Sequence, residues 1–218
     1  MDKSQYKNVY VFVEQRDGVV QNVALELLGK ARELADALHE QVIALLLGKG
    51  VKDKADELIA AGADVVLSIE ADELAQYTTE PYAQAITQVI HERKPSILLI
   101  GATSIGRDLG PRLSARIGTG LTADCTGLDI SEDGDLLMTR PAFGGNLMAT
   151  IICKEHRPQM STVRPGVMRA KAADPTRKGK VEDVKINFDK SKFRVRILET
   201  VKAVSYTHLR AHETLRHL

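Results

Sequence analysis

Three short segments carry side chains suited to binding a charged group, and the first is GATSIGRDLGPRLSARIG (residues 101–118). An apolar run ends there in small and hydroxyl residues, and Arg107 and Arg112 follow five residues apart. Beyond the carboxyl ends of parallel strands, helix N-termini present free N–H groups to ligands. Thr103, Gly106 and Arg107 are therefore candidates to bind a phosphate or the edge of a flavin.

A plainer interpretation of the same segment is an ordinary strand-to-helix turn. Arg107 would then pair with Asp108 or with a partner chain. The glycine spacing matches neither GxGxxG nor the phosphate-binding GxxxxGK[ST], so the motif alone does not decide between the two interpretations.

The second segment is TRPAFGGNLMA (139–149) and the third is STVRPGVM (161–168). In the second, glycines permit positive φ or close approach of a neighbour, beside an arginine and an amide. In the third, an arginine precedes a Pro-Gly turn. Each segment fits either a plain loop or a surface that another chain contacts. The candidate residues are Arg140, Gly144, Gly145, Asn146 and Arg164.

No arrangement of residues typical of catalysis or metal binding emerges. Cys125 and Cys153 lack metal-ligand spacing and are expected to be buried free thiols. In ATP pyrophosphatases a phosphate-binding SGGxDS loop follows the first strand. This chain reads EQRDGVVQN (14–22) at that position, so the loop is missing. We therefore expect a protein without catalytic side chains and without a metal.

The composition is that of an ordinary soluble domain. Of 218 residues, 44% are hydrophobic and 27% charged, and the net charge of +1 gives no electrostatic case for nucleic acid. The start, MDKSQYKN, lacks the apolar region of a signal peptide, and no apolar run approaches the ~18 residues of a membrane span. These features favour a cytoplasmic protein.

Apolar runs alternate with amphipathic segments as far as residue 130. Strands are expected at 8–15, 41–48, 64–70, 96–103 and 121–130, and helices at 21–40, 51–63, 78–95 and 104–118. This repeated strand–helix order predicts an α/β fold of three layers, a parallel sheet with helices on both faces.

The alternation of strand and helix patterns ends after residue 130. A hairpin-like turn at 131–135 and closely spaced apolar runs without helical periodicity predict a β-rich extension of the sheet. A polar connector at 172–180 then leads to two expected strands, 181–188 and 192–202.

Residues 204–218 differ from everything before them. His208 and His212 have the i, i+4 spacing of metal ligands on a helix, with His217 as the remaining candidate. The segment also closely resembles the translation of a sequencing adapter. We expect it to lie outside the domain and assign it no function.

Four motifs in order carry a resemblance to a known family. They are VYVFVEQRDGVVQNVALELLGKARELA, KPSILLIGATSIGRDLGPRLSARIGTGLTADCTGLDI, TRPAFGGNLMATIIC and MSTVRPGVM. Together they resemble the N-terminal domain of the electron-transferring flavoprotein α-subunit over residues 8 to 202, approximately. The resemblance implies an adenine-nucleotide-α-hydrolase-like, Rossmann-like domain spanning 1–203.

The resemblance also implies cofactors and partners. In that family a C-terminal domain, without counterpart in this sequence, holds FAD, so we expect a truncated product. A β-subunit with AMP or a second FAD completes the heterodimer. The dimer carries electrons from acyl-CoA or other dehydrogenases to an acceptor, and bifurcating members split the electron pair. A bacterial, cytoplasmic protein of fatty acid β-oxidation is one such setting.

Within the resemblance, the chain is a platform for the β-subunit. Arg107, Arg112, Arg140 and Arg164 are then expected at the carboxyl-end rim of the sheet, against partner chain or flavin edge. The alternative is a stand-alone ATP- or AMP-binding domain of the same fold. The missing phosphate loop after the first strand counts against that alternative.

Overall fold

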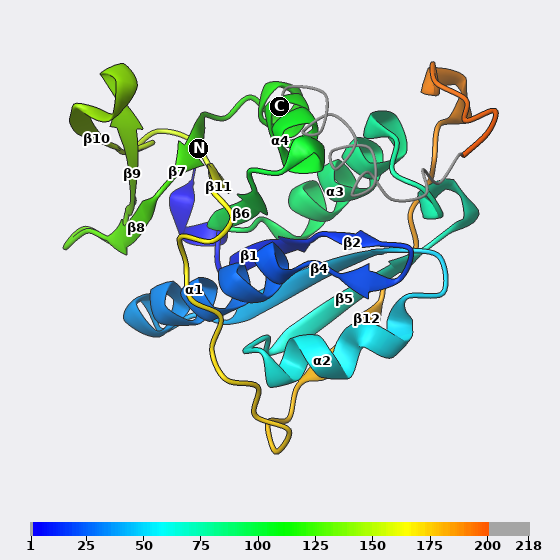
Figure 1. The fold of residues 1–218 in the computed structure, drawn as a ribbon, viewed down its shortest axis with the longest axis horizontal. Coiled ribbons are helices and arrows are strands. Elements are labelled where there is room, and N and C mark those ends of the chain that lie inside the picture. Colours follow the sequence, from blue (N-terminus) through cyan, green and yellow to red (C-terminus); the bar gives the residue numbers. More distant parts are fainter. Residues whose placement is uncertain (1, 201–218) are drawn as a thin grey trace, which may run out of the picture.

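A computed structural model describes residues 2–200, and its centre is a parallel sheet (Figure 1). Its seven strands lie in the order β12-β5-β4-β1-β6-β11-β7. They are β1 (Val9–Val13), β4 (Val42–Gly48), β5 (Val65–Glu70), β6 (Ile97–Gly101), β7 (Leu121–Cys125), β11 (Gln159–Val163) and β12 (Lys180–Asp183). Each neighbouring pair is parallel, as the continuous apolar runs predict.

Four α-helices connect these strands and cover both faces of the sheet. They are α1 (Asn22–Leu38), α2 (Ala55–Ala60), α3 (Thr79–Arg93) and α4 (Ser104–Ile117). Residues of α1 and α2 share one buried cluster and residues of α3 and α4 the other. The expected three-layer α/β fold, with its helix and strand positions to residue 125, is confirmed.

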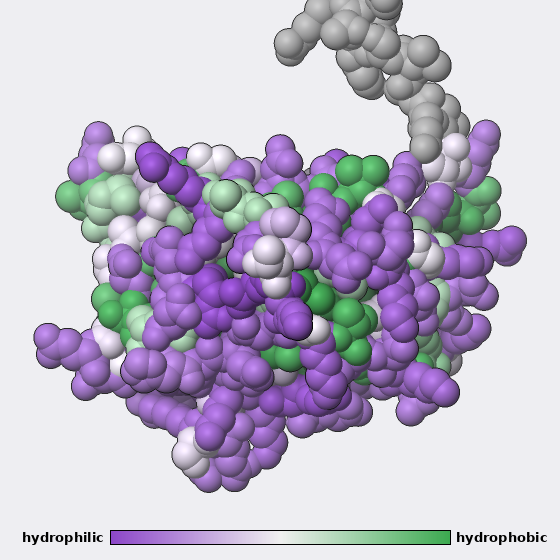
Figure 2. Space-filling view, turned by 90° about the horizontal axis from the view of Figure 1, so that it is seen from below, coloured by the Kyte–Doolittle hydropathy of each residue, from purple (hydrophilic) through white to green (hydrophobic). Residues whose placement is uncertain are grey.

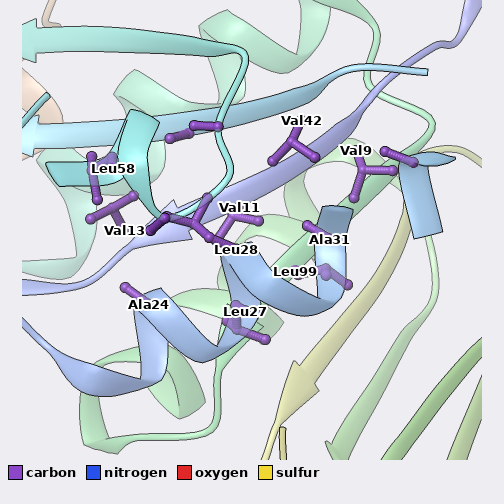
Figure 3. Close-up of a cluster of buried hydrophobic side chains, with 14 of the residues drawn as sticks. Val9, Val11, Val13, Ala24, Leu27, Leu28, Ala31, Val42, Leu58 and Leu99 are labelled. Carbon is purple, nitrogen blue, oxygen red and sulfur yellow. The ribbon is translucent and has the colours of Figure 1, made fainter. Parts of the chain in front are cut away.

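Alternation along β1 divides the core between the two faces. Val9, Val11 and Val13 face α1, whereas Tyr10 and Phe12 lie in the cluster on the α3 side. Figure 3 shows the first group meeting the apolar stripe of α1, including Leu27 and Leu28. Burial of each such leucine stabilises the folded state by about 1.5–3 kcal/mol. The aliphatic core therefore fixes the position of the sheet edge that carries the candidate site.

The chain leaves the sheet after Cys125. The strand expected at 121–130 divides at Thr126, whose N–H donates to the Thr139 carbonyl (2.8 Å), while Asp124 adopts φ 60°. A separate antiparallel sheet follows, made of β8 (Gly127–Ile130), β9 (Leu136–Ala142) and β10 (Leu147–Ile151). The β-rich extension therefore exists, but it forms a separate sheet that contacts α1 through β8, and only β11 joins the main sheet, between β6 and β7.

The final described residues differ from expectation. Of the strand expected at 181–188, only the first part pairs, as β12. The rest lies extended over α3, where Gln88 bonds both backbone groups of Asn187 (2.9 and 3.1 Å). The expected strand at 192–202 is wrong over its described part, which forms no strand as far as residue 200. The alternating apolar residues after β12, Val184, Ile186 and Phe188, pack on the α3-side cluster instead of on a neighbouring strand. In the later segment Val195 and Leu198 are exposed.

Short elements complete the described chain. A hairpin follows β1 directly, formed by β2 (Gln15–Arg16) and β3 (Val19–Val20). The 3-10 turns are η1 (Lys3–Gln5), η2 (Lys52–Lys54), η3 (Asp72–Leu74), η4 (Phe143–Gly145) and η5 (Lys190–Lys192). The hairpin stands where a phosphate loop would begin.

Candidate functional site

Thr103 and Gly106 fix the first turn of α4 against the end of β6. The Thr103 hydroxyl accepts a hydrogen bond from the Gly106 N–H (3.1 Å) and so caps the helix. A Cβ on Gly106 would lie 1.7 Å from the Gly101 carbonyl oxygen. Both residues therefore hold α4 close to the carboxyl edge of the sheet, whatever they contact from outside.

A buried carboxylate lies in front of this helix N-terminus. Glu14 follows β1, is 2% exposed, and accepts hydrogen bonds from the Thr103 hydroxyl and from Arg16 (2.8 Å). The sheet order reverses between β1 and β6, the place where this class of fold binds ligands. We call Glu14, Arg16 and Thr103 the closed crevice. An anion approaching α4 would meet the Glu14 carboxylate.

The closed crevice retains only a shallow hollow. A cavity of about 370 Å³ lies against Glu14, Arg16, Thr103 and Pro165. The β2–β3 hairpin forms one side, since Val19, Val20 and Gln21 also line it. Hairpin and carboxylate together replace the backbone cradle that a nucleotide phosphate needs.

Two of the predicted arginines, Arg107 and Arg164, meet at Asp124 farther along the same edge, and the charge of Arg140 also acts on this carboxylate. Arg164 donates two hydrogen bonds to the Asp124 carboxylate (2.7 and 3.3 Å), and Arg107 lies 3.6 Å from it. Arg107 also donates to the Ala102 carbonyl (2.9 Å), which fixes its direction. We call Arg107, Asp124, Arg140 and Arg164 the arginine cluster.

Charge is unbalanced in the arginine cluster. The hydrogen bonds from Arg164, with smaller effects of Arg107 and Arg140, hold the pKa of Asp124 below its ordinary value. One carboxylate faces three guanidinium groups, so the cluster retains positive charge. It is suited to a carboxylate or phosphate brought by another molecule.

Arg112 lies apart from the arginine cluster. It pairs with Glu80 of α3 (3.0 Å), which Arg116 also contacts (2.7 Å). The expectation that all four arginines share one rim is therefore wrong for Arg112, which lies in the middle of α4 and faces α3. Asp108, the alternative partner of Arg107, instead accepts hydrogen bonds from Tyr77 and Thr79 (both 2.6 Å).

The remaining predicted residues form the tip of the β9–β10 hairpin. Gly144 and Gly145 have φ of 70° and 93°, as expected, and Asn146 follows them in an exposed turn. Nothing lies within 4 Å of a Cβ placed on either glycine, so the turn requires their conformation and not a close neighbour. Residues 143–148 of the hairpin tip are all exposed.

Nucleophile and metal chemistry find no support in the described residues. Burial raises the pKa of Cys125 to about 11, so its thiol is protonated and unreactive. Residues 2–200 hold no group of three potential metal ligands, and no helix among them is long and apolar enough to cross a membrane. His208, His212 and His217 lie outside the described residues.

Sequence reasoning missed Glu14 and Asp124. Each is a lone carboxylate at the end of a strand, within EQRDG and TADCT. The signal was available, because parallel strand ends share one edge and bring such residues to the arginines.

Comparison with known proteins gives consistent similarities. Residues 9–189 match the family model described as the electron transfer flavoprotein domain. The chain is 53% identical over 199 residues to the electron transfer flavoprotein subunit alpha of Thermoanaerobacterium thermosaccharolyticum, covering 91% of this chain and 60% of that one. The Clostridium acetobutylicum protein of the same name is 52% identical over 205 residues (93% and 61%).

A third relative has a different name. The lactate dehydrogenase (NAD(+),ferredoxin) subunit LctC of Acetobacterium woodii is 42% identical over 215 residues, which cover 99% of this chain and 51% of that one. The chain thus spans about 60% of the length of the first two relatives and about half of the third.

Proposed function

The chain belongs to the electron transfer flavoprotein domain family, and from that premise we propose that it acts within an electron-carrying α-subunit. Its role there is a platform that binds the β-subunit, with residues 1–203 as one α/β domain. Redox chemistry belongs to the cofactor and not to side chains of this chain. On this proposal the protein is an electron carrier and not an enzyme.

The arginine cluster is the observation that carries the platform role. Arg107 of α4 and Arg164 after β11 both pair with Asp124, and Arg140 of β9 adds a positive charge that acts on the same carboxylate. Unbalanced guanidinium groups at a sheet edge favour contact with an acidic partner surface or an anionic cofactor edge. Gly144, Gly145 and Asn146 extend this surface.

FAD is the cofactor of the proposed whole protein and supplies one- or two-electron transfer when bound. The arginine cluster fits its negatively charged edge, because three guanidinium groups face a single carboxylate. Most of the FAD contacts belong to the part of the relatives that this chain does not span. AMP or a second FAD would lie on the β-subunit.

The electron donors and acceptors follow from the same family. Acyl-CoA dehydrogenases, as in fatty acid β-oxidation, or other flavin dehydrogenases would supply electrons to the heterodimer in a bacterial cytoplasm. The LctC relative, named for both NAD(+) and ferredoxin, favours a bifurcating member as an alternative.

The competing function is a stand-alone ATP- or AMP-binding domain. The closed crevice argues against it, since Glu14 occupies the position in which a phosphate would face α4. A phosphate beside a buried carboxylate would be repelled in surroundings of low dielectric constant.

The test is co-expression of the full chain with its cognate β-subunit, followed by size-exclusion chromatography and a flavin absorbance scan. We expect a colourless heterodimer. A yellow complex would mean that this chain and the β-subunit together suffice to trap flavin, and Arg107 and Arg140 would be the next residues to mutate. Failure to form a complex, with ATP retained on the purified chain, would contradict the proposal and favour nucleotide binding.

A further inference from the structure

A hairpin arm leaves the body of the molecule beside the arginine cluster. β8 pairs with β9 only as far as Thr139, so Arg140, Pro141 and Ala142 pair solely with β10. We call residues 140–152, from the end of β9 through η4 and β10, the arm. Figure 1 shows it at the left-hand end of the molecule, away from the helices.

Large apolar side chains of the arm are exposed to solvent. Phe143 is 81% exposed, and Leu147 and Met148 are 59% each. Ile151 and Ile152 add further exposed apolar surface beside them. Figure 2 shows a largely hydrophilic face with hydrophobic residues at its left-hand end, and others near its middle and right. Large apolar side chains exposed together in one short segment are typical of an interaction site.

The arm also offers a free strand edge. Among the described residues, β10 pairs with β9 on one side and with no strand on the other. Its sequence, LMATI, carries none of the charges or prolines that protect exposed edges. Another chain can therefore add backbone hydrogen bonds there as well as apolar contacts.

The charge beside the arm indicates what kind of partner fits. Arg140 begins the arm, pairs with Ala149 of β10 and acts on Asp124, so the arm carries a positive charge in the same hairpin as its apolar residues. A second copy of this chain would bring the same three arginines to the contact and would be repelled. A partner with carboxylates around an apolar centre is complementary.

We infer that the arm docks on a different protein chain, whose contact surface is apolar in the centre and acidic where it meets Arg107, Arg140 and Arg164. This inference rests on the proposed function, in which that chain is the β-subunit. Phe143 is the anchor, because an exposed aromatic residue at the tip of a hairpin can fill a pocket on the partner.

The test compares two variants of the full chain in titrations with the cognate β-subunit. The arm variant carries Phe143→Ser, Leu147→Thr and Met148→Thr. The control variant carries Val19→Thr and Val195→Thr, which are 63% and 70% exposed but lie off the arm. We expect the arm variant to bind about 30-fold more weakly or worse, and the control to bind like the wild type.

The outcomes separate this inference from the proposed function. Equal binding by wild type and arm variant would overturn the inference and leave the proposed function standing. A wild type that does not bind the β-subunit would overturn both. If the wild type formed a homodimer and the arm variant were a monomer, the inference that the partner is a different chain would be overturned.

A single change guards against misfolding of the arm variant. Phe143→Ala lies in η4, beyond the paired part of both strands, and leaves the β9–β10 ladder intact. It is expected to weaken binding about 10-fold or more with an unchanged thermal midpoint. Unchanged affinity would contradict the anchoring role of Phe143.

Discussion

Two regions at the carboxyl edge of the sheet differ in how far their polar and apolar groups are paired and covered by the chain itself. In the closed crevice, buried Glu14 is matched by Arg16 and Thr103, and the β2–β3 hairpin covers it. In the arginine cluster and the arm, one carboxylate faces three arginines and large apolar side chains stand in solvent.

The difference teaches where the molecule directs its interactions. A region satisfied within its own chain contributes to stability and leaves little to offer a ligand. A region with surplus charge and exposed apolar surface gains by meeting a partner. The usual ligand position of the fold is therefore closed. Contacts with a partner are expected beside it, at the arginine cluster and the arm.

The largest effect is expected from Gly106→Ala, which tests the closed region. Its Cβ would lie 1.7 Å from the Gly101 carbonyl oxygen, so β6 and α4 must separate. We expect a loss of about 3 kcal/mol in the free energy of unfolding, measured with urea. Gly110→Ala in the same helix meets only a side chain, at 3.1 Å, and serves as control. Equal stability of both variants would contradict the close contact.

Glu14→Ala is expected to have the next largest effect. The change leaves the half-buried Thr103 hydroxyl without its acceptor and Arg16 without its partner. We expect about 1–3 kcal/mol of lost stability in urea unfolding, with unchanged affinity for the β-subunit. Weaker binding to the β-subunit with unchanged stability would place the closed crevice in the interface. It would contradict the claim that only the arginine cluster and the arm contact a partner.

Asp124→Asn probes the charge of the open region and has a smaller effect. The folded pKa of Asp124 lies below the ordinary 3.8, chiefly because of Arg164. Its stabilising contribution is therefore complete above pH 3.8 and is lost as the pH falls toward the folded pKa. Thermal midpoints should differ between wild type and variant at pH 7, and the difference should shrink as the pH is lowered below 3.8. A pH-independent difference would exclude this ion pair as the cause.

The smallest effect on stability is expected from the arm itself. Phe143→Ser and Leu147→Thr remove side chains that are 81% and 59% exposed. Their combined effect on the free energy of unfolding should stay within about 0.5 kcal/mol. A larger loss would show that the arm packs against its own chain in solution.

Much of the fold could be predicted because each element has its own period. Helix α1 shows the 3.6-residue stripe, and the buried strands are apolar throughout. The insertion of β11 between β6 and β7 could not be predicted. Hydrophobic periodicity identifies a strand but does not say which strands lie beside it. The division at Thr126 depends on one backbone bond to Thr139, distant in the chain.

The candidate site was predictable to the extent that position after a strand determines it. Arg107 and Arg164 follow strands that end at one edge, so their convergence follows from parallel pairing. Arg112 lies mid-helix, where the same rule does not apply. Exposure of Phe143 could not be predicted, since an aromatic residue between two strands is as typical of a core.

Hydrogen–deuterium exchange of the full chain, with and without the cognate β-subunit, tests the central claim most directly. The account predicts added protection of backbone amides across residues 140–152 and around Arg164, with no change at residues 14–20 of the closed crevice and its hairpin. Protection confined to residues 14–20 and Thr103, with an arm that exchanges as freely as before, would contradict it.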